Sequence, residues 1–357
     1  MSKVNLHEVL GAFNIENDIE AYGNGHINDT YCSDPTKYII QRINTSIFTN
    51  PDELMENIEN VTSFLSDKIR AAGGDPKRET LTVIKTIDGK NCYKCDDGNV
   101  FRVYRFITDT KSIENDKTLE DLRNAGKGFG RFQQMLDDFP VEKLYETIKD
   151  FHNTPKRVEA LKTAIAENKA GRADSVKAEI EFALKNSDFA DTVIKGMESG
   201  EIPVRVTHND TKINNILFDV KTGEAVAVID LDTVMPGSML YDFGDALRMG
   251  GSTGAEDEVD LSKVNFDKEC FKYFAEGYLS EVKDVLTPME IELLPFSVKL
   301  LTYECGIRFL TDYLNGDTYF KIHRENHNLD RARNQFKLVA DITAMEDELK
   351  EIIKTLI

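Results

Sequence analysis

Residues 207–232 read THNDTKINNILFDVKTGEAVAVIDLD, and this stretch contains the pattern that decides the fold. A polar loop, HNDTKINN, follows a short β-type run at 204–207. Two further β-type runs, 216–218 and 225–229, flank a turn at 221–223, an arrangement typical of a β-hairpin. We therefore expect a polar loop that leads into a two-stranded ribbon, with further polar residues at the open end of that ribbon.

The expected register of the hairpin places two oxygen ligands side by side. A ribbon centred between Thr222 and Gly223 puts Asn215 directly opposite Asp230, because the two positions are symmetric about that centre. Mg²⁺ prefers hard oxygen ligands and takes few of them from protein. The spacing therefore predicts a magnesium site at Asn215 and Asp230.

The loop before the hairpin supplies the other groups that phosphoryl transfer needs. Asp210 can accept a proton from a substrate hydroxyl, and Lys212 can reach a transferring phosphate. The transition state is loose, so the protein mainly positions groups and stabilises charge. Any one of these residues is common in turns, but the joint pattern H-x-D-x-K-x-x-N followed by I-D-x-D rarely arises by chance. It predicts a magnesium-dependent phosphotransferase with Asp210 and Lys212 as its catalytic residues.

Composition and charge narrow the class of protein. Hydrophobic residues make up 41% of the 357 residues and charged residues 30%, an ordinary globular mixture. The net charge of -19 opposes binding to nucleic acid or to an anionic membrane. No stretch approaches the roughly 20 apolar residues of a membrane span, and the first residues do not resemble a signal peptide. We expect a cytoplasmic protein, and the sequence implies no protein partner.

The organisation changes near residue 110. Before it, β-type runs dominate at 37–43, 81–87, 91–95 and 100–107. One helix interrupts them, and it opens at Pro51 with apolar positions that follow a helical period. After residue 110 the expected helices lie at 122–136, 180–200, 268–283, 288–316 and 330–356. The pattern predicts an α+β protein with a small N-terminal antiparallel β lobe, 1–107, and a larger mainly helical lobe, 108–357.

The loop and the IDLD segment resemble the catalytic loop and metal-binding strand of the aminoglycoside phosphotransferase and choline kinase superfamily, whose fold is protein-kinase-like. Further segments resemble the N-acetylhexosamine 1-kinases within it: YGNGHINDTY (22–31), YIIQRINTSIF (38–48), IDLDTVMPGSMLYDFGD (229–245), ELLPFSVKLLTYECGIRFLTDYLNGDTYF (292–320) and HNLDRAR (327–333). This resemblance covers most of the chain. It implies ATP- and Mg²⁺-dependent phosphorylation of the anomeric hydroxyl of N-acetylglucosamine or N-acetylgalactosamine, which gives the sugar 1-phosphate.

The resemblance assigns roles position by position. Asp210 matches the catalytic base, Asn215 and Asp230 match the metal ligands, and Asp232 is an additional candidate ligand. The residues that match the nucleotide site are Gly23, Gly25 and Asn28 in the loop over the phosphates, Arg42 on the next strand, and Tyr104 and Arg105 in the hinge that meets adenine.

The chain departs from the protein-kinase pattern on the strand at 37–43. Where a kinase lysine would hold the phosphates, this strand has Gln41 and Arg42. Arg42 can contact phosphate with two hydrogen bonds, and it can pair with Glu56 or Glu59 on the following helix. We therefore expect Arg42 to replace the lysine.

For the sugar, the resemblance points to His26, Arg308 and Tyr319, beside Asp210 itself. Arg308 lies in the apolar helical run CGIRFLTDYL, so we expect its charge to face a polar cleft or a partner. The alternatives are a salt bridge from Arg308 to another helix and a turn that is merely capped by His26.

Two motifs resemble sites, but the pattern favours structural roles. Asp242-Phe243-Gly244 spells a kinase metal motif, yet it follows the hairpin that already supplies Asp230. We expect Asp242 to brace the catalytic loop through backbone hydrogen bonds. The stretch GKGFG at 126–130 falls within a helical period, which predicts close helix packing. The cysteine pair Cys92 and Cys95 has no second pair, as a four-ligand zinc site would require.

Two other functions remain open at this point. A homoserine or methylthiosugar kinase of the same superfamily would share Asp210, Asn215 and Asp230. A binding protein with a degenerate kinase fold should have lost one of the three, and none is missing. The choice between the two amino sugars, the tolerance of other sugars, ATP versus GTP, the oligomeric state and lobe closure are likewise open.

Overall fold

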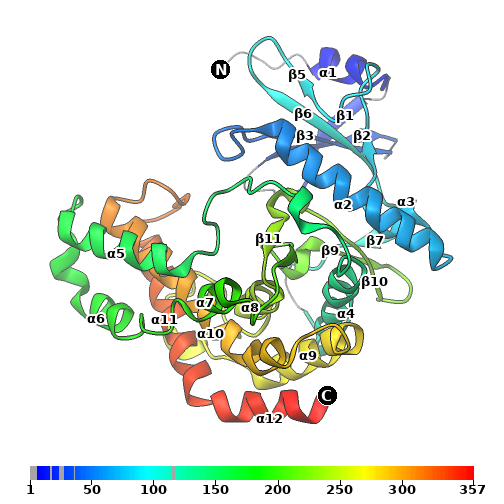
Figure 1. Cartoon of the computed structure of the whole chain (residues 1–357). Coiled ribbons are helices and arrows are strands. Elements are labelled where there is room, and N and C mark those ends of the chain that lie inside the picture. Colours follow the sequence, from blue (N-terminus) through cyan, green and yellow to red (C-terminus); the bar gives the residue numbers. More distant parts are fainter. Residues whose placement is uncertain (1–5, 17, 24–27, 36, 115–116) are drawn as a thin grey trace. The chain divides into compact units, whose positions relative to one another are not determined.

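A computed structural model describes residues 6–16, 18–23, 28–35, 37–114 and 117–357. The expected site residues Gly25 and His26 lie outside the described residues. The chain forms two compact units (Figure 1). Unit 1 comprises Met1–Ile113, Met135–Lys149 and Asn214–Pro236, and unit 2 comprises Glu114–Gln134, Asp150–Ile213 and Gly237–Ile357.

An antiparallel sheet organises unit 1. Its strands run in the order β1-β2-β3-β6-β4, and β5 pairs with β6. Their bounds are β1 Asp18–Ala21, β2 Asp29–Asp34, β3 Tyr38–Ile43, β4 Val83–Ile84, β5 Tyr93–Lys94 and β6 Val100–Arg105. Ile40, Phe101 and Val103 are fully buried against the short helix α1 (Leu6–Ala12). Four of these strands lie within the runs expected from the sequence, so the expected antiparallel lobe is confirmed.

The helix expected at Pro51 is α2 (Pro51–Ala71). Asn50 caps it by accepting a hydrogen bond from the N–H of Glu53, and Pro51 occupies the first turn, where no N–H is needed. Leu54, Ile58 and other apolar residues at helical spacing are buried. A short helix, α3 (Pro76–Glu79), follows, and Arg78 pairs with Asp219 at 2.5 Å.

The hairpin is present, but its register is not the expected one. Strand β9 (Ile216–Asp219) pairs with β10 (Ala225–Val228) and with β7 (Thr110–Lys111). Val228 faces Ile216, and a bulge separates the pairs of Ala225 and Ala227. The turn closes where Asp219 N–H donates to Glu224 O. Asn215 therefore lies opposite Ile229, whose N–H donates to the carbonyl of Asn215 at 2.9 Å. The predicted pairing of Asn215 with Asp230 is wrong by one residue.

Unit 2 contains the longer helices. Their bounds are α4 Leu119–Met135 (whose last residue belongs to unit 1), α5 Thr154–Glu167, α6 Lys177–Lys185, α7 Thr192–Ser199, α8 Met239–Gly250, α9 Lys268–Val282, α10 Pro288–Asn315, α11 His327–Ala344 and α12 Glu346–Leu356. The expected helix at 180–200 is two helices, α6 and α7. The one at 330–356 is also two, which meet at Met345. No helix of the described residues is long and apolar enough to cross a membrane.

The remaining elements are short. They are β8 Arg205–Thr207, β11 Met235–Gly237, and the 3₁₀ turns Val141–Lys143, Ala173–Val176, Ile213–Asn215, Leu231–Thr233 and Leu261–Lys263. The polar loop that the sequence singled out follows β8, as expected.

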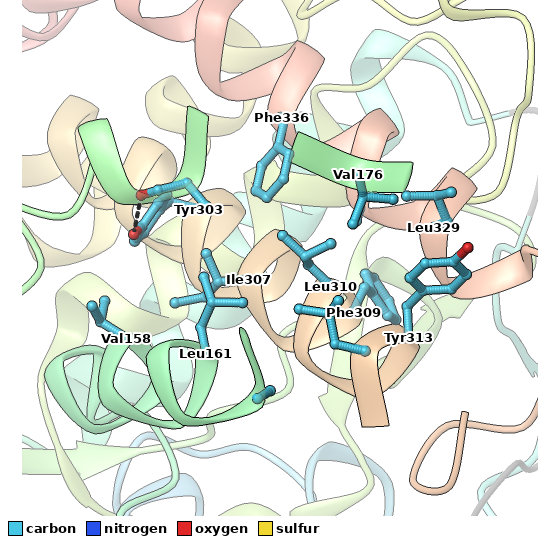
Figure 2. Packing of buried hydrophobic residues seen from close by; sticks show 14 of the residues in the cluster. Val158, Leu161, Val176, Tyr303, Ile307, Phe309, Leu310, Tyr313, Leu329 and Phe336 are labelled. Carbon is cyan, nitrogen blue, oxygen red and sulfur yellow. Dashed lines mark hydrogen bonds between the residues drawn. The ribbon is translucent and has the colours of Figure 1, made fainter. Parts of the chain in front are cut away.

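Helix α10 is the centre of the core of unit 2. Figure 2 shows Tyr303, Ile307 and Leu310 of α10 among buried side chains of α5 and α11, including Leu161 and Phe336. The Tyr303 hydroxyl donates to the carbonyl of Ala183 at 2.7 Å. Burying each apolar side chain of this size stabilises the fold by about 1.5–3 kcal/mol. This packing therefore fixes the position of α10 and of the polar residues on its other faces.

Glycines bring α4 and α9 together. A Cβ on Gly126 would lie 2.2 Å from the carbonyl oxygen of Phe274, and one on Gly277 would lie 1.9 Å from that of Arg123. Real Cβ atoms do not approach so closely, so the two backbones can meet only where both residues are glycine. A Cβ on Gly130 would likewise lie 2.8 Å from the carbonyl oxygen of Tyr278, so the expected packing role is confirmed for Gly126 and Gly130.

Candidate active site

The loop of residues 208–212 in unit 2 is held by Asp242 in the first turn of α8. Its carboxylate accepts hydrogen bonds from the N–H of His208 at 2.9 Å, from the N–H of Asn209 at 2.7 Å and from Nε2 of Gln133 at 2.6 Å. Burial raises the pKa of Asp242, although these donors act in the opposite direction. The expected bracing role of Asp242 is confirmed.

A second carboxylate on α8 holds the next part of the loop. The N–H of Thr211 donates to Asp245 at 3.0 Å, and the Thr211 hydroxyl donates to the carbonyl of Asp242 at 2.6 Å. Arg248, one turn further along α8, donates to Asp245 at 3.2 Å. Asn209 has a φ of 66°, a left-handed conformation that is uncommon outside glycine. The loop thus turns sharply and is fixed by hydrogen bonds on both sides of Asp210.

His152 and Glu304 form a polar network that contacts the same loop at Asn209. One ring nitrogen of His152 lies 2.8 Å from Glu304 and the other lies 3.3 Å from the carbonyl oxygen of Asn209. Thr154 donates to the second carboxylate oxygen of Glu304 at 2.6 Å. These residues and Asp245 could not be predicted from the sequence, because 34 residues separate Thr211 from Asp245, 57 separate His152 from Asn209, and 152 separate His152 from Glu304.

The structure brings Asp210 and Lys212 together. The Lys212 ammonium lies 2.8 Å from the carboxylate of Asp210, and their side chains are 39% and 21% exposed respectively. Burial of Asp210 disfavours its charged form, but the charge and hydrogen bond of Lys212 outweigh it and hold the pKa of Asp210 below its usual value. Arg248 acts in the same direction. Asp210 is therefore ionised at neutral pH and able to accept a proton or a hydrogen bond.

The expected metal ligands lie in unit 1, near the open end of the hairpin. Asn215 is buried before β9, whereas Asp230 is exposed just after β10 and has a left-handed φ of 59°. Strained backbone of this kind is common at functional sites. A carboxamide oxygen and a carboxylate suit an ion such as Mg²⁺, which takes few protein ligands. Among the described residues, no group of three or more His, Cys, Asp or Glu side chains could hold a metal ion.

A buried ion pair that the sequence analysis did not predict lies in the same unit. Arg102 on β6 pairs with Asp232 at 2.5 Å, and both side chains are at most 5% exposed. Arg102 also donates to Gln41 on the facing strand at 2.8 and 3.0 Å. Asn28 donates to the other oxygen of Asp232 at 2.8 Å. We call Asn28, Gln41, Arg102 and Asp232 the Asp232 cluster.

Arg42 lies on the outside of the sheet. It donates to Asp29 at 2.7 Å and to Asn99 at 3.2 Å. The expected pairing with Glu56 or Glu59 is not observed, because Asp29 stands directly opposite Arg42 in the ladder and Glu59 pairs with Lys85. A phosphate contact of Arg42 stays a prediction.

The other expected nucleotide residues follow the sheet. Gly23 has a φ of 71°, which glycine adopts without strain, and nothing lies within 4 Å of the place of a Cβ. Tyr104 is buried on β6, and the N–H of Arg105 donates to the carbonyl of Thr82. Their contact with a nucleotide stays a prediction.

The expected sugar residues Arg308 and Tyr319 both contact Phe320. The Arg308 guanidinium lies over the rings of Phe320 and Phe151, 5.5 and 5.9 Å from their centres, and the Tyr319 ring is edge-on to Phe320. Tyr319 is 67% exposed. Its backbone N–H donates to Asp312, which fixes the loop after α10.

Comparison with known proteins shows the family of this chain. Residues 18–274 match the model of the phosphotransferase enzyme family, APH. The matched segment covers more than half of the chain and includes the loop, the hairpin and the Asp232 cluster. The chain is a member of this family.

Solved structures share the fold of this phosphotransferase. A microcompartment-associated aminopropanol kinase is 16% identical with a TM-score of 0.64, covering 98% of this chain and 99% of that one. An aminoglycoside phosphotransferase from Alicyclobacillus acidocaldarius is 11% identical with a TM-score of 0.64, covering 99% and 98%. Spectinomycin phosphotransferase APH(9)-Ia, solved with ADP and spectinomycin, is 14% identical with a TM-score of 0.59, covering 98% and 99%.

The expected protein-kinase-like fold is therefore confirmed. An antiparallel sheet near the N-terminus and a larger helical part match the phosphotransferase structures. Family membership makes the chain a nucleotide-dependent phosphotransferase for a small molecule, and such kinases use a nucleoside triphosphate with a divalent metal ion.

Proposed function

We propose that this phosphotransferase transfers the γ-phosphoryl group of ATP to the anomeric hydroxyl of an N-acetylhexosamine. The products are ADP and the N-acetylglucosamine or N-acetylgalactosamine 1-phosphate. The observation that carries the chemistry is the fixed loop of unit 2, in which Asp210 is ionised beside Lys212. The sugar rests on the resemblance of the segments at 22–31, 292–320 and 327–333 to N-acetylhexosamine 1-kinases.

The roles follow from the chemistry of each group. Asp210 accepts the proton of the sugar hydroxyl as its oxygen bonds to the γ-phosphorus and the bond to the ADP oxygen breaks. Lys212 keeps Asp210 ionised and offers positive charge to the transferring phosphoryl group. Asn215 and Asp230 would hold Mg²⁺, which when bound neutralises charge on the phosphate oxygens.

The remaining assignments concern binding. Gly23, Gly25, Asn28 and Arg42 would contact the phosphates, and the hinge residues Tyr104 and Arg105 would meet adenine through their backbone. His26, Arg308 and Tyr319 would contact the sugar. An aromatic face at Tyr319 and a guanidinium at Arg308 suit a neutral polyol with an acetamido group.

A panel of acceptors tests the proposal. The protein is assayed for ADP release with ATP and Mg²⁺ against N-acetylglucosamine, N-acetylgalactosamine, other sugars, homoserine and a methylthioribose. We expect turnover with the N-acetylhexosamines and a sugar 1-phosphate product identified by ³¹P NMR. Turnover with homoserine or the methylthiosugar alone would contradict the hexosamine and support the other kinase class.

A further inference from the structure

Arg308, an expected acceptor residue, has a second arginine beside it that the roles above do not use. Arg157 on α5 donates hydrogen bonds to the carbonyl oxygens of Phe151 at 2.9 Å and of Asp150 at 3.3 Å. The ring of the same Phe151 lies 5.9 Å from the Arg308 guanidinium. Both arginines therefore contact one residue, Arg157 through its backbone and Arg308 through its ring.

Neither guanidinium is paired with a carboxylate of the described residues. Both hydrogen bonds of Arg157 go to neutral carbonyl groups, and its buried Nε has no partner. Among the parts of the chain that the structure describes, no oxygen accepts a hydrogen bond from Arg308. A guanidinium carries five N–H donors, so those of Arg308 remain open to a ligand.

The two positive charges act on each other. Burial lowers the pKa of Arg157, and the charge of Arg308 lowers it further, so the guanidiniums are close enough to repel. The neighbouring acid Asp150 is paired with Lys156 at 2.6 Å. A third cation brought to this place would meet two like charges.

The carboxylates on either side of Arg308 have their oxygens occupied. Glu304 and Asp312 lie one turn before and one turn after Arg308 on α10, and both are at most 4% exposed. Both oxygens of Glu304 contact the network of His152 described above. The oxygens of Asp312 accept backbone N–H groups of residues 318–320, each at 2.9 Å. An ammonium group could bind either carboxylate only by displacing these donors.

The aromatic rings at this place are occupied in the same way. A cation can bind the face of an aromatic ring, but the Arg308 guanidinium already lies over Phe320 and Phe151, 5.5 and 5.9 Å from their centres. The groups that Arg157 and Arg308 present are therefore donors and positive charge.

This place adjoins the catalytic loop. Phe151 is followed by His152, whose ring nitrogen lies 3.3 Å from the carbonyl oxygen of Asn209. Asn209 is followed by Asp210, the proposed base. Arg157, Arg308 and the loop all belong to unit 2.

We propose that Arg157 and Arg308 form a positively charged wall of the acceptor site, which admits neutral hydroxylated molecules and excludes cationic ones such as free amino sugars. The proposal rests on the proposed function and adds Arg157 as a specificity-determining residue. The carbonyl oxygen of an acetamido group can accept from a guanidinium, whereas an ammonium group offers only donors. Arg157 acts through its charge and by holding the backbone of Phe151, whose ring lies beside Arg308.

Two acceptors of the same shape test the selection by charge. N-glycolylglucosamine carries a neutral hydroxyl where N-glycylglucosamine carries an amine, which is protonated at pH 6.5 because such amines have a pKa of about 8. We expect kcat/KM of the wild type, measured by ADP release, to be about tenfold higher for the neutral compound, the effect of like charges on the order of 10 Å apart. Equal values in an enzyme that phosphorylates N-acetylglucosamine would overturn this inference alone.

Variants test whether the two arginines cause the selection. Arg157→Gln and Arg308→Gln each remove one charge and should lower the ratio of the two kcat/KM values from about tenfold to about threefold. Arg157→Lys keeps the charge and should keep the ratio. Arg333→Gln removes a guanidinium that is paired with Glu179 at 2.6 Å, and it should also leave the ratio unchanged.

The outcomes separate the two proposals. A ratio that stays at the wild-type value in both Arg157→Gln and Arg308→Gln would overturn the role of these arginines and leave the proposed function intact. A wild type that phosphorylates no N-acetylhexosamine would overturn the proposed function and this inference with it.

Discussion

Asp232 and Asp242 are buried carboxylates ten residues apart in the chain, and different kinds of group stabilise their negative charges. Asp232 in unit 1 faces a buried guanidinium, that of Arg102, and a side-chain amide. Asp242 in unit 2 faces two backbone N–H groups and the amide of Gln133. We call Asp242, Gln133 and the loop N–H groups the Asp242 cluster.

The difference separates charge balance from geometry. In the Asp232 cluster the positive charge of Arg102 compensates the negative charge of Asp232, so loss of either partner leaves the other charge buried and unpaired. In the Asp242 cluster the charge is spread over neutral donors that belong to the catalytic loop, so its loss releases the loop. Loss of the Arg102 charge should therefore affect mainly stability, and loss of the Asp242 carboxylate should affect both stability and catalysis.

The largest effect is expected from Arg102→Met. It leaves Asp232 buried without its cation, which should lower the free energy of unfolding by about 3–5 kcal/mol, as measured by urea denaturation. The double variant Arg102→Met with Asp232→Asn should recover much of this loss. Arg105→Met, at an exposed position on the same strand, should change the free energy by less than about 0.5 kcal/mol. A single variant as stable as the wild type would show that the charges are not paired as described.

A somewhat smaller loss of stability, with a loss of activity, is expected from Asp242→Ala. Two backbone N–H groups and the Gln133 amide lose their acceptor, and we expect a net cost of about 1–3 kcal/mol, that of one group left unpaired. Misplacement of the loop should also lower kcat about 10²-fold. Asp191→Ala, a surface carboxylate change, serves as the control. Normal kcat in folded Asp242→Ala would show that the loop does not depend on this anchor.

The contact of α4 with α9 tests how the Asp242 cluster is supported. Gln133 lies on α4, and its amide oxygen accepts from Tyr278 of α9. Gly126→Ala would drive a methyl group into the backbone of α9 and should cost about 1–3 kcal/mol of unfolding free energy, with a smaller decrease of kcat. Gly11→Ala, in a helix with nothing within 4 Å, is the matched control and should be neutral or stabilising. Equal stability of both variants would refute the close packing.

The smallest effect is a shift in pH dependence, which is separate from the lower kcat expected when the positive charge of Lys212 is lost. The pKa of Asp210 is lowered because the charge and hydrogen bond of Lys212 outweigh burial, which raises it. Lys212→Met removes the lowering contribution and leaves burial, so the pKa of Asp210 should rise. Activity requires the ionised form and is lost as pH falls through this pKa, so the acid limb of kcat/KM should move to higher pH. Lys221→Met in the exposed hairpin turn should leave the profile unchanged; an unmoved limb in Lys212→Met would contradict the coupling.

Local patterns predicted most of the fold. Pro51 and the apolar period of α2 and the glycines of α4 are encoded within a few turns of chain. The bracing role of Asp242 could also be predicted, since its position after the hairpin excluded it from the metal site. These features depend on short-range geometry.

Features that depend on distant pairing could not be predicted. The hairpin register failed by one residue because a bulge near Val226 adds a residue that no composition rule reveals. Arg102 was missed because its importance arises from facing Gln41 across the sheet and from the burial of Asp232. The ends of the network His152–Asn209–Glu304 are 152 residues apart, beyond the reach of any local motif.

Turnover by Asp210→Asn tests the central claim most directly. The variant keeps the size of the side chain but cannot accept the proton of the hydroxyl. With ATP, Mg²⁺ and N-acetylglucosamine, we predict that kcat falls about 10²–10⁴-fold, while the affinity for ATP, measured by calorimetry, stays within about threefold. Wild-type turnover by a folded Asp210→Asn would contradict the assignment of Asp210 as the base.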